Sequence, residues 1–163
     1  MKNRPILIAG IAIAILVGGF FYNKYRIAPK LQFESLQLKT LTGLKVSPVA
    51  FKGEKVFLNF FATWCGPCIR ELPSLEAAQE ALRNEPVHFF LISDEPVSVL
   101  KRFEQTYGTR LTILHSEKKL PDLKIVTVPT SYLLNGKGET VFKKTGEENW
   151  ASDAMIEKLR NSE

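Results

Sequence analysis

Residues that bind metals or build disulfide frameworks are scarce in this chain, which has two cysteines and two histidines among 163 residues. Two cysteines cannot form the several bridges of a secreted disulfide scaffold. A structural zinc site needs four ligands, and His88 and His115 lie outside the usual ligand spacing from the cysteines. Cys65 and Cys68, three positions apart, are therefore predicted to be catalytic and not structural.

The chain also lacks a block of like charges, an internal repeat and a low-complexity segment. Its 22 basic and 17 acidic residues give a net charge of +5, but the two signs alternate along the sequence. Nucleic-acid binding would need a basic stripe together with an element that reads or stacks bases. The composition instead predicts an ordinary solvated surface around a packed domain, with no nucleic-acid partner.

Near its start the chain has eighteen successive residues without a charge, 5–22. As a helix they would extend about 27 Å, close to the thickness of the hydrocarbon core of a bilayer. Basic residues lie on both sides, and the stretch ends in bulky aromatics instead of the small-residue cleavage site of a signal peptide. The pattern predicts a retained transmembrane helix. The flanking charges alone leave open which side of the membrane the rest of the chain faces.

The rest of the chain alternates between short apolar runs and amphipathic segments. Residues 55–62 form a continuous apolar run, typical of a central strand buried on both faces. A helix is predicted at 69–84, where Leu72, Leu75, Ala78 and Leu82 recur at helical spacing. The other predicted elements are an initial strand or hairpin at 31–38, strands at 87–92, 111–114, 131–134 and 139–142, a turn at 135–138, and helices at 96–107 and 150–159.

This order of elements predicts an α/β sandwich around one mixed sheet. The last helix would bury Ala151, Ala154, Met155 and Leu159. Along the chain we expect a membrane anchor with its flanks at 1–26, a tether at 27–32 and one domain at 33–163.

Cys65 and Cys68 lie between the predicted central strand and the predicted helix that follows it. Unpaired backbone N–H groups at a helix N-terminus favour a thiolate, which is the nucleophile in disulfide exchange. Pro67 suits a first helical turn because it has no N–H to leave unpaired. The spacing predicts that Cys65 is the exposed attacker and that Cys68, one turn further on, resolves the mixed disulfide. An inert buried pair is the alternative reading.

The segment 61–68, Phe-Ala-Thr-Trp-Cys-Gly-Pro-Cys, resembles the active site of thioredoxins. Its extension at 69–73, Ile-Arg-Glu-Leu-Pro, is similar to the TlpA/ResA-like branch of that superfamily, and the resemblance covers residues 31–159. It implies a thioredoxin-like three-layer sandwich with a central mixed sheet, plus one N-terminal transmembrane helix. It also implies a thiol–disulfide oxidoreductase outside the cytoplasm, in the bacterial cytoplasmic (inner) membrane with its catalytic domain facing the periplasm or cell exterior.

The resemblance gives further residues a role. The segment 127–130 resembles the one that carries the cis-proline of the superfamily, which implies a cis bond before Pro129. The implied substrate-binding residues are Trp64, Gly66, Pro67, Val128 and Pro129. The resemblance also implies that the central insertion, including residues 93–107, shapes the choice of partner.

Two polar residues near the motif, Glu71 and Asn59, are candidates for a role at the site, and Glu71 has two alternative interpretations. The resemblance implies that Glu71 handles protons at the active site, whereas its position on a predicted helix equally suits a solvent-facing glutamate. Asn59 stands where thioredoxins commonly have a buried aspartate, and we expect a buried amide with its hydrogen bonds satisfied, which cannot titrate.

The expected function is the reduction of disulfides in exported proteins, with apocytochrome c as the client type that the resemblance implies. A membrane thiol reductant would restore the Cys65–Cys68 dithiol, and no cofactor beyond this redox-active disulfide is expected. Two alternatives stay open. One is a disulfide oxidase or isomerase for exported proteins. The other is a module that holds copper(I) between the two thiolates, although no Met or His lies near them in sequence.

Overall fold

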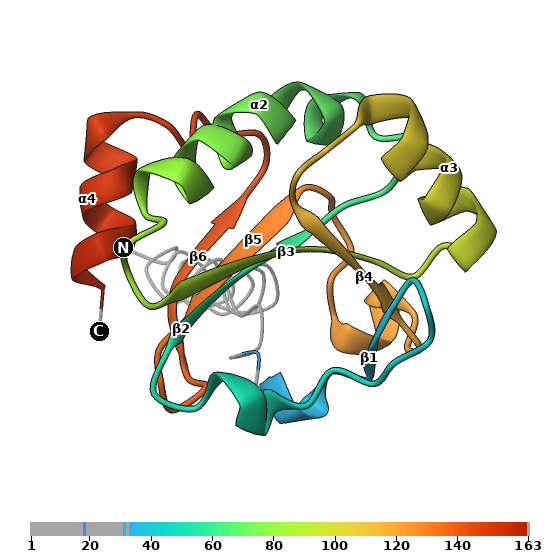
Figure 1. The fold of residues 1–163 in the computed structure, drawn as a ribbon, viewed down its shortest axis with the longest axis horizontal. Coiled ribbons are helices and arrows are strands. Elements are labelled where there is room, and N and C mark those ends of the chain that lie inside the picture. The colour runs from blue at the N-terminus through green and yellow to red at the C-terminus, as the bar shows by residue number, and fades with distance from the viewer. Residues whose placement is uncertain (1–17, 19–30, 32, 163) are drawn as a thin grey trace, which may run out of the picture.

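The computed structural model describes Gly18, Leu31 and residues 33–162, and in this part six strands form one mixed sheet (Figure 1). The strand order is β1-β4-β3-β2-β5-β6, with β2, β3 and β4 parallel to one another and β1, β5 and β6 each antiparallel to its neighbour. The strands are β1 (Leu38–Thr40), β2 (Lys55–Phe60), β3 (Val87–Ser93), β4 (Thr112–Ser116), β5 (Thr130–Leu134) and β6 (Thr140–Thr145).

Three α-helices cover one face of the sheet: α2 (Gly66–Ala81), α3 (Val97–Tyr107) and α4 (Asp153–Asn161). The predicted stripe of α2 is buried there, including Leu75 and Leu82, and Phe57 of β2 points into the same cluster. A run of apolar residues suits β2 because its side chains alternate between two buried faces. Val56, Leu58 and Phe60 accordingly lie in a second cluster on the opposite face.

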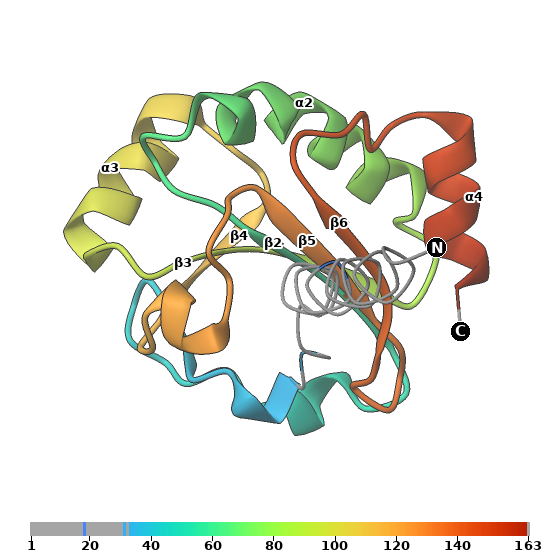
Figure 2. The same ribbon diagram turned by 180° about the vertical axis from the view of Figure 1, so that it is seen from behind.

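This opposite face has no α-helix within the described part of the chain. It is covered by the short 3₁₀ helices η1 (Phe33–Ser35), η2 (Pro48–Phe51) and η3 (Leu120–Leu123) and by the segments beside them. Figures 1 and 2 show the α-helices along one side of the sheet and the 3₁₀ segments along the other. The α/β fold around a mixed sheet is as predicted, but one outer layer of the sandwich consists of short turns.

Two predicted segments differ from the structure. The initial strand predicted at 31–38 is wrong, because η1 occupies residues 33–35 and β1 begins only at Leu38. The last helix begins at Asp153 instead of residue 150 and buries Leu159, with Met155 and Ile156 partly buried. Met155 and Leu159 face the core as predicted, whereas Ala151 precedes α4 and Ala154 lies on its exposed side.

The predicted boundary between tether and domain is only partly matched by the structure. Leu31, predicted to lie in the tether, is buried in the core, and its carbonyl oxygen accepts a hydrogen bond from Thr140 Oγ1 at 2.9 Å. The predicted anchor at 1–26 lies outside the described residues, apart from Gly18. Among the residues that are described, none of the helices combines the length and apolar character needed to cross a bilayer.

The strand pairing brings several chain segments to one edge of the sheet. Phe60, the last residue of β2, pairs with Ile92 near the end of β3 and with Thr130 at the start of β5. Thr130 pairs in turn with Thr145 at the end of β6. The segments that follow β2, β3 and β6 and the segment that precedes β5 therefore meet at this edge, which is where the site is built.

Candidate active site

The two cysteines form a disulfide at the N-terminus of α2. Cys65 is the N-cap residue, Pro67 occupies the first turn, and the Cα atoms of Cys65 and Cys68 are 5.3 Å apart. The backbone N–H of Cys68 donates a hydrogen bond to Cys65 Sγ at 3.3 Å. Cys65 Sγ thus takes the place of a capping oxygen, and the same N–H group would stabilise negative charge on this sulfur in the reduced protein.

Access to the disulfide differs from the prediction. Cys65 is only 5% exposed and Cys68 only 2%, so the expectation of an exposed Cys65 is wrong for the disulfide form. Its neighbours are open, because Trp64 is 76% exposed and Gly66 is exposed as well. A partner sulfur would therefore reach Cys65 beside these two residues.

The Val128–Pro129 peptide bond is cis, which confirms the expectation for this segment. Pro129 is buried directly before β5, and its carbonyl oxygen accepts a hydrogen bond from Gly146 N at 2.8 Å. Because the next residue, Thr130, pairs with Phe60, the proline lies at the sheet edge from which the chain leads to Cys65. Val128 is half-buried and packs against both core clusters.

Glu71 is 2% exposed, so the alternative of a solvent-facing glutamate is wrong. Its Oε1 accepts a hydrogen bond from Asn59 Nδ2 at 2.7 Å. Its Oε2 accepts from Trp150 Nε1 at 3.2 Å and from Glu148 N at 3.3 Å. Asn59 Nδ2 also donates to Ser131 Oγ at 2.9 Å, so the expectation of a satisfied buried amide is confirmed.

The pKa of Glu71 is raised above its ordinary value, chiefly because burial disfavours the charged carboxylate. The hydrogen bonds from Asn59, Trp150 and Glu148 N oppose this effect, whereas the nearby charge of Glu147 adds to it. The result is a carboxyl group on the same helix as Cys68, three residues further on, that takes up a proton more readily than an exposed glutamate.

Other residues of the site were not predicted. Trp150 was expected to begin a helix, but it is fully buried and holds Glu71. Glu95 accepts hydrogen bonds from Thr63, two residues before Cys65. The sequence did offer one indication for Glu95, which comes two residues after the end of β3, a strand parallel to β2. Parallel strands end at the same edge of a sheet, so a residue there lies near the cysteines.

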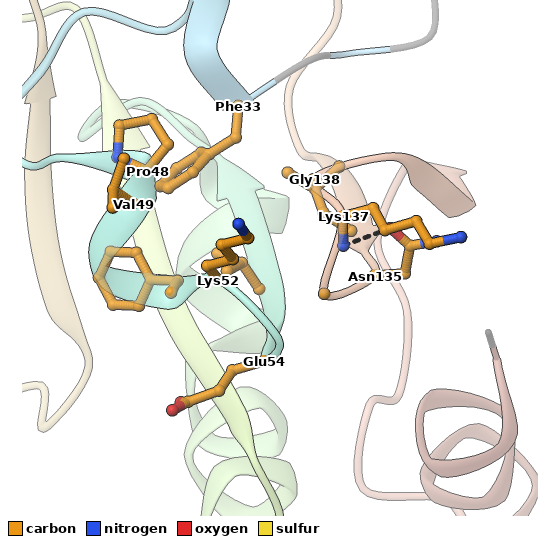
Figure 3. Close-up of a pocket in the computed structure, with 12 residues that line it drawn as sticks. Phe33, Pro48, Val49, Lys52, Glu54, Asn135, Lys137 and Gly138 are labelled. Atoms are coloured by element: carbon orange, nitrogen blue, oxygen red, sulfur yellow. Dashed lines mark hydrogen bonds between the residues drawn. The ribbon is translucent and has the colours of Figure 1, made fainter.

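Two of the cavities on the described part of the chain bear on where a ligand could bind. One of about 460 Å³ is lined by apolar residues such as Phe33, Phe51 and Leu134 and lies between η2 and the β5–β6 turn (Figure 3). It is at the sheet edge opposite to the disulfide, so none of the predicted substrate-binding or catalytic residues lines it. The second, about 290 Å³, is lined by Arg70, Glu71, Ser74, Glu147, Glu148 and Asn149. Among the described residues no three His, Cys, Asp or Glu side chains are grouped as metal ligands.

A disulfide at a helix N-terminus, a cis-proline at the same sheet edge and a mixed sheet with this order define a thiol–disulfide oxidoreductase with the thioredoxin fold. The comparison with known proteins gives the same class. The chain belongs to the AhpC/TSA family, which it matches over residues 29–142.

Its relatives include thiol–disulfide oxidoreductases of the kind that the sequence resembles. The thioredoxin-like protein YneN of Bacillus subtilis is 34% identical over 143 residues, which cover 80% of this chain and 84% of that protein. The thiol-disulfide oxidoreductase ResA of Bacillus anthracis is 28% identical over 91% of this chain and 92% of that protein. The crystal structure of StoA from Bacillus subtilis superposes with a TM-score of 0.59, at 26% identity, over 82% of this chain and 96% of that one.

Proposed function

We propose that this oxidoreductase works outside the cytoplasm as a reductase of disulfides in exported proteins, with apocytochrome c as one client type. The observation that supports this proposal is the arrangement of the redox pair on α2, where the buried Glu71 follows Cys68 by three residues. Helix-terminal N–H groups favour a thiolate at Cys65, and Glu71 can exchange a proton with Cys68.

The cycle begins with the reduced protein. The Cys65 thiolate attacks one sulfur of the client disulfide, an S–S bond forms between Cys65 and that sulfur, and the other client sulfur leaves as a thiolate that takes a proton from solvent. The Cys68 thiol then gives its proton to the Glu71 carboxylate and attacks Cys65 Sγ. The second client sulfur leaves and takes up the proton from Glu71. The client has gained two electrons and two protons, and the Cys65–Cys68 disulfide has formed.

Five residues would contact the client in this mechanism. Trp64, Gly66 and Pro67 flank the reactive sulfur on one side, and Val128 and Pro129 lie at the same sheet edge on the segment before β5. The exposed indole of Trp64 offers a large apolar contact surface for an unfolded or extended client segment.

The proposal includes the place of the protein in the cell. Residues 1–26 would be a single-pass anchor with the N-terminus in the cytoplasm, residues 27–32 a tether, and the remainder a catalytic domain facing the periplasm or the cell exterior. The client would be a cysteine-containing exported protein, and a membrane dithiol would reduce the Cys65–Cys68 disulfide again. No further cofactor takes part.

Two features near the pair support the proposed direction of electron flow. Strong oxidants of this fold class stabilise their reduced form with a very low thiolate pKa, about 3.5 in DsbA. Here the Cys-Gly-Pro-Cys sequence matches that of thioredoxin, and an ionised Glu71 would oppose a thiolate on α2. Both features favour a low reduction potential.

The test is the reduction potential of the full chain in detergent, followed in thiol buffers by the fluorescence of Trp64 next to Cys65. We expect a value near that of thioredoxin, about −270 mV, whereas a value near −120 mV would mean an oxidase. Cys65→Ser should abolish reduction of insulin disulfides, and Cys68→Ser should accumulate the mixed disulfide, detected by mass spectrometry. Insulin reduction at the wild-type rate by Cys65→Ser would overturn the mechanism.

A further inference from the structure

Asp94 and Glu95 directly follow β3 at the edge of the sheet that carries the disulfide. Glu95 uses both carboxylate oxygens to hold the loop before Cys65. Thr63 N donates to Oε2 at 2.7 Å and Thr63 Oγ1 donates to Oε1 at 2.8 Å, while Ser93 Oγ donates to Oε2 at 3.1 Å. Hydrogen bonds to an ionised acceptor are about twice as strong as those between neutral groups.

Asp94, the residue before Glu95, holds a different segment, the one that begins η3. Asp94 Oδ2 accepts a hydrogen bond from Leu120 N at 3.2 Å, and Lys119 Nζ donates to the Asp94 carbonyl oxygen, also at 3.2 Å. Leu120 begins η3, and the chain continues from η3 to the cis-proline. Leu120, Leu123 and Ile125 are buried, so this connection is anchored in the core as far as residue 125.

Between Ile125 and Val128 the chain leaves the core for two residues, and Thr130 Oγ1 donates to Thr127 O at 2.7 Å. Val126 is 83% exposed and Thr127 is exposed as well. On the opposite side, Trp64 is exposed between Thr63, which Glu95 holds, and Cys65, whose N–H donates to Ala62 O at 3.0 Å. Two adjacent residues thus hold the bases of both segments: Glu95 binds Thr63 directly, and Asp94 binds Leu120, from which the chain leads through η3 to Pro129.

We propose that Asp94 and Glu95 form a brace that sets the distance between the Thr63–Cys65 loop and the segment leading to Pro129. They are positioning residues for exchange with polypeptide disulfides, an inference that rests on the proposed function in assigning the client to these two segments. A client that lies across both segments requires their correct spacing. A small disulfide that only reaches Cys65 does not.

The test compares full-length variants in detergent. Glu95→Gln removes the negative charge and leaves one oxygen for the two donors of Thr63, which weakens this contact, and Thr63→Val removes the hydroxyl at constant shape. Glu104→Gln, on the exposed face of α3, is the matched control. The rates at which the reduced protein reduces insulin and hydroxyethyl disulfide are measured by stopped flow. Glu95→Gln should lower the ratio of the two rates about tenfold, and Glu104→Gln should leave it unchanged.

Two further results decide the assignment. The Thr63→Val/Glu95→Gln double variant should lose no more than Glu95→Gln alone, because both changes remove one shared contact. Amide hydrogen exchange, which does not depend on activity, should rise in Glu95→Gln both at residues 61–65 and at residues 126–129. Faster exchange at 61–65 alone, or additive losses, would overturn the brace. A wild-type protein that does not reduce insulin would instead count against the proposed function, and the exchange data would still decide the brace.

Discussion

Replacing Glu71 tests the buried carboxyl group directly. In the structure Glu71 accepts three hydrogen bonds, and every donor is a neutral N–H group. Glu71→Ala would leave Asn59 and Trp150 with buried donors that lack their partner, at about 1–3 kcal/mol each. The adjoining 290 Å³ cavity admits water to the third donor, Glu148 N. We therefore expect Glu71→Ala to lower the free energy of unfolding by about 2–6 kcal/mol.

Glu71→Gln should behave differently, because its neighbours can rearrange. If the Asn59 amide turns over, its oxygen can accept from the NH₂ group of the introduced glutamine, and the Ser131 hydroxyl can donate where it previously accepted. The oxygen of the new side chain can still accept from Trp150. This variant should fold and keep the shape of the site without a titratable group.

The raised pKa of Glu71 makes the free energy of unfolding depend on pH. Burial raises the pKa of Glu71 above its ordinary value of 4.5, so above that pH the folded protein binds more protons here than the unfolded chain. The stabilisation is complete below the unfolded pKa and is lost as the pH rises through the folded pKa. Relative to wild type, Glu71→Gln should gain stability from about pH 5 upward, by at most about 1.4 kcal/mol per pH unit. Urea unfolding at several pH values measures this difference.

The catalytic effect should be larger. General acid–base catalysis typically contributes about 10²–10⁴-fold, and we expect Glu71→Gln to resolve the mixed disulfide about 100-fold more slowly near neutral pH. Acid-quenched samples analysed by mass spectrometry would show the mixed disulfide accumulating. Glu80→Gln, exposed on the same helix, is the control. Resolution by Glu71→Gln within twofold of wild type across the pH range would refute a proton role for Glu71.

Two other substitutions test the packing and the client surface. Gly136→Ala would place a Cβ atom 2.7 Å from the backbone carbonyl carbon of Gly53. We therefore expect the free energy of unfolding, measured in urea, to fall by about 1–3 kcal/mol, with Lys137→Ala as the neutral control. Wild-type stability of Gly136→Ala would mean that the two turns can separate. Trp64→Ala should leave the thermal midpoint unchanged because the indole is 76% exposed, yet reduce insulin about tenfold more slowly. Leu44→Ala, equally an exposed apolar truncation, should not affect this rate, and equal losses in both variants would argue against a client contact at Trp64.

The reactive pair could be predicted because its signal is local. An apolar run, two cysteines one turn apart and a proline between them specify a strand, a helix start and a redox pair within one short segment. Most strands and helices after residue 54 followed from periodicity in the same way, whereas the strand predicted at 31–38 did not. The cis bond before Pro129 came only from the resemblance, since nothing in a single sequence distinguishes it from the far commoner trans bond.

The environment of Glu71 could not be predicted, because it depends on residues that are distant in sequence. Its partners come from β2 and from the segment between β6 and α4, 12 and 79 residues away in the case of Asn59 and Trp150. The same limitation applies to Glu95 and Thr63, which are 32 residues apart. The inner face of α4 was right for Met155 and Leu159 and wrong for Ala151 and Ala154, whose small side chains give little weight to a helical stripe.

Burying the Glu71 carboxylate costs more free energy than three N–H donors require. An ionised carboxylate without a cation costs free energy on burial, and Arg70, the nearest residue in sequence that could neutralise it, donates instead to Glu147. A glutamine with the flipped Asn59 amide would satisfy the site with no charge to bury. A carboxyl group at this position is therefore poorly explained by stability and well explained by chemistry that needs a proton to come and go. Since Cys68 must lose a proton when the disulfide forms, this carboxyl group agrees with the proton-transfer role that we propose for Glu71.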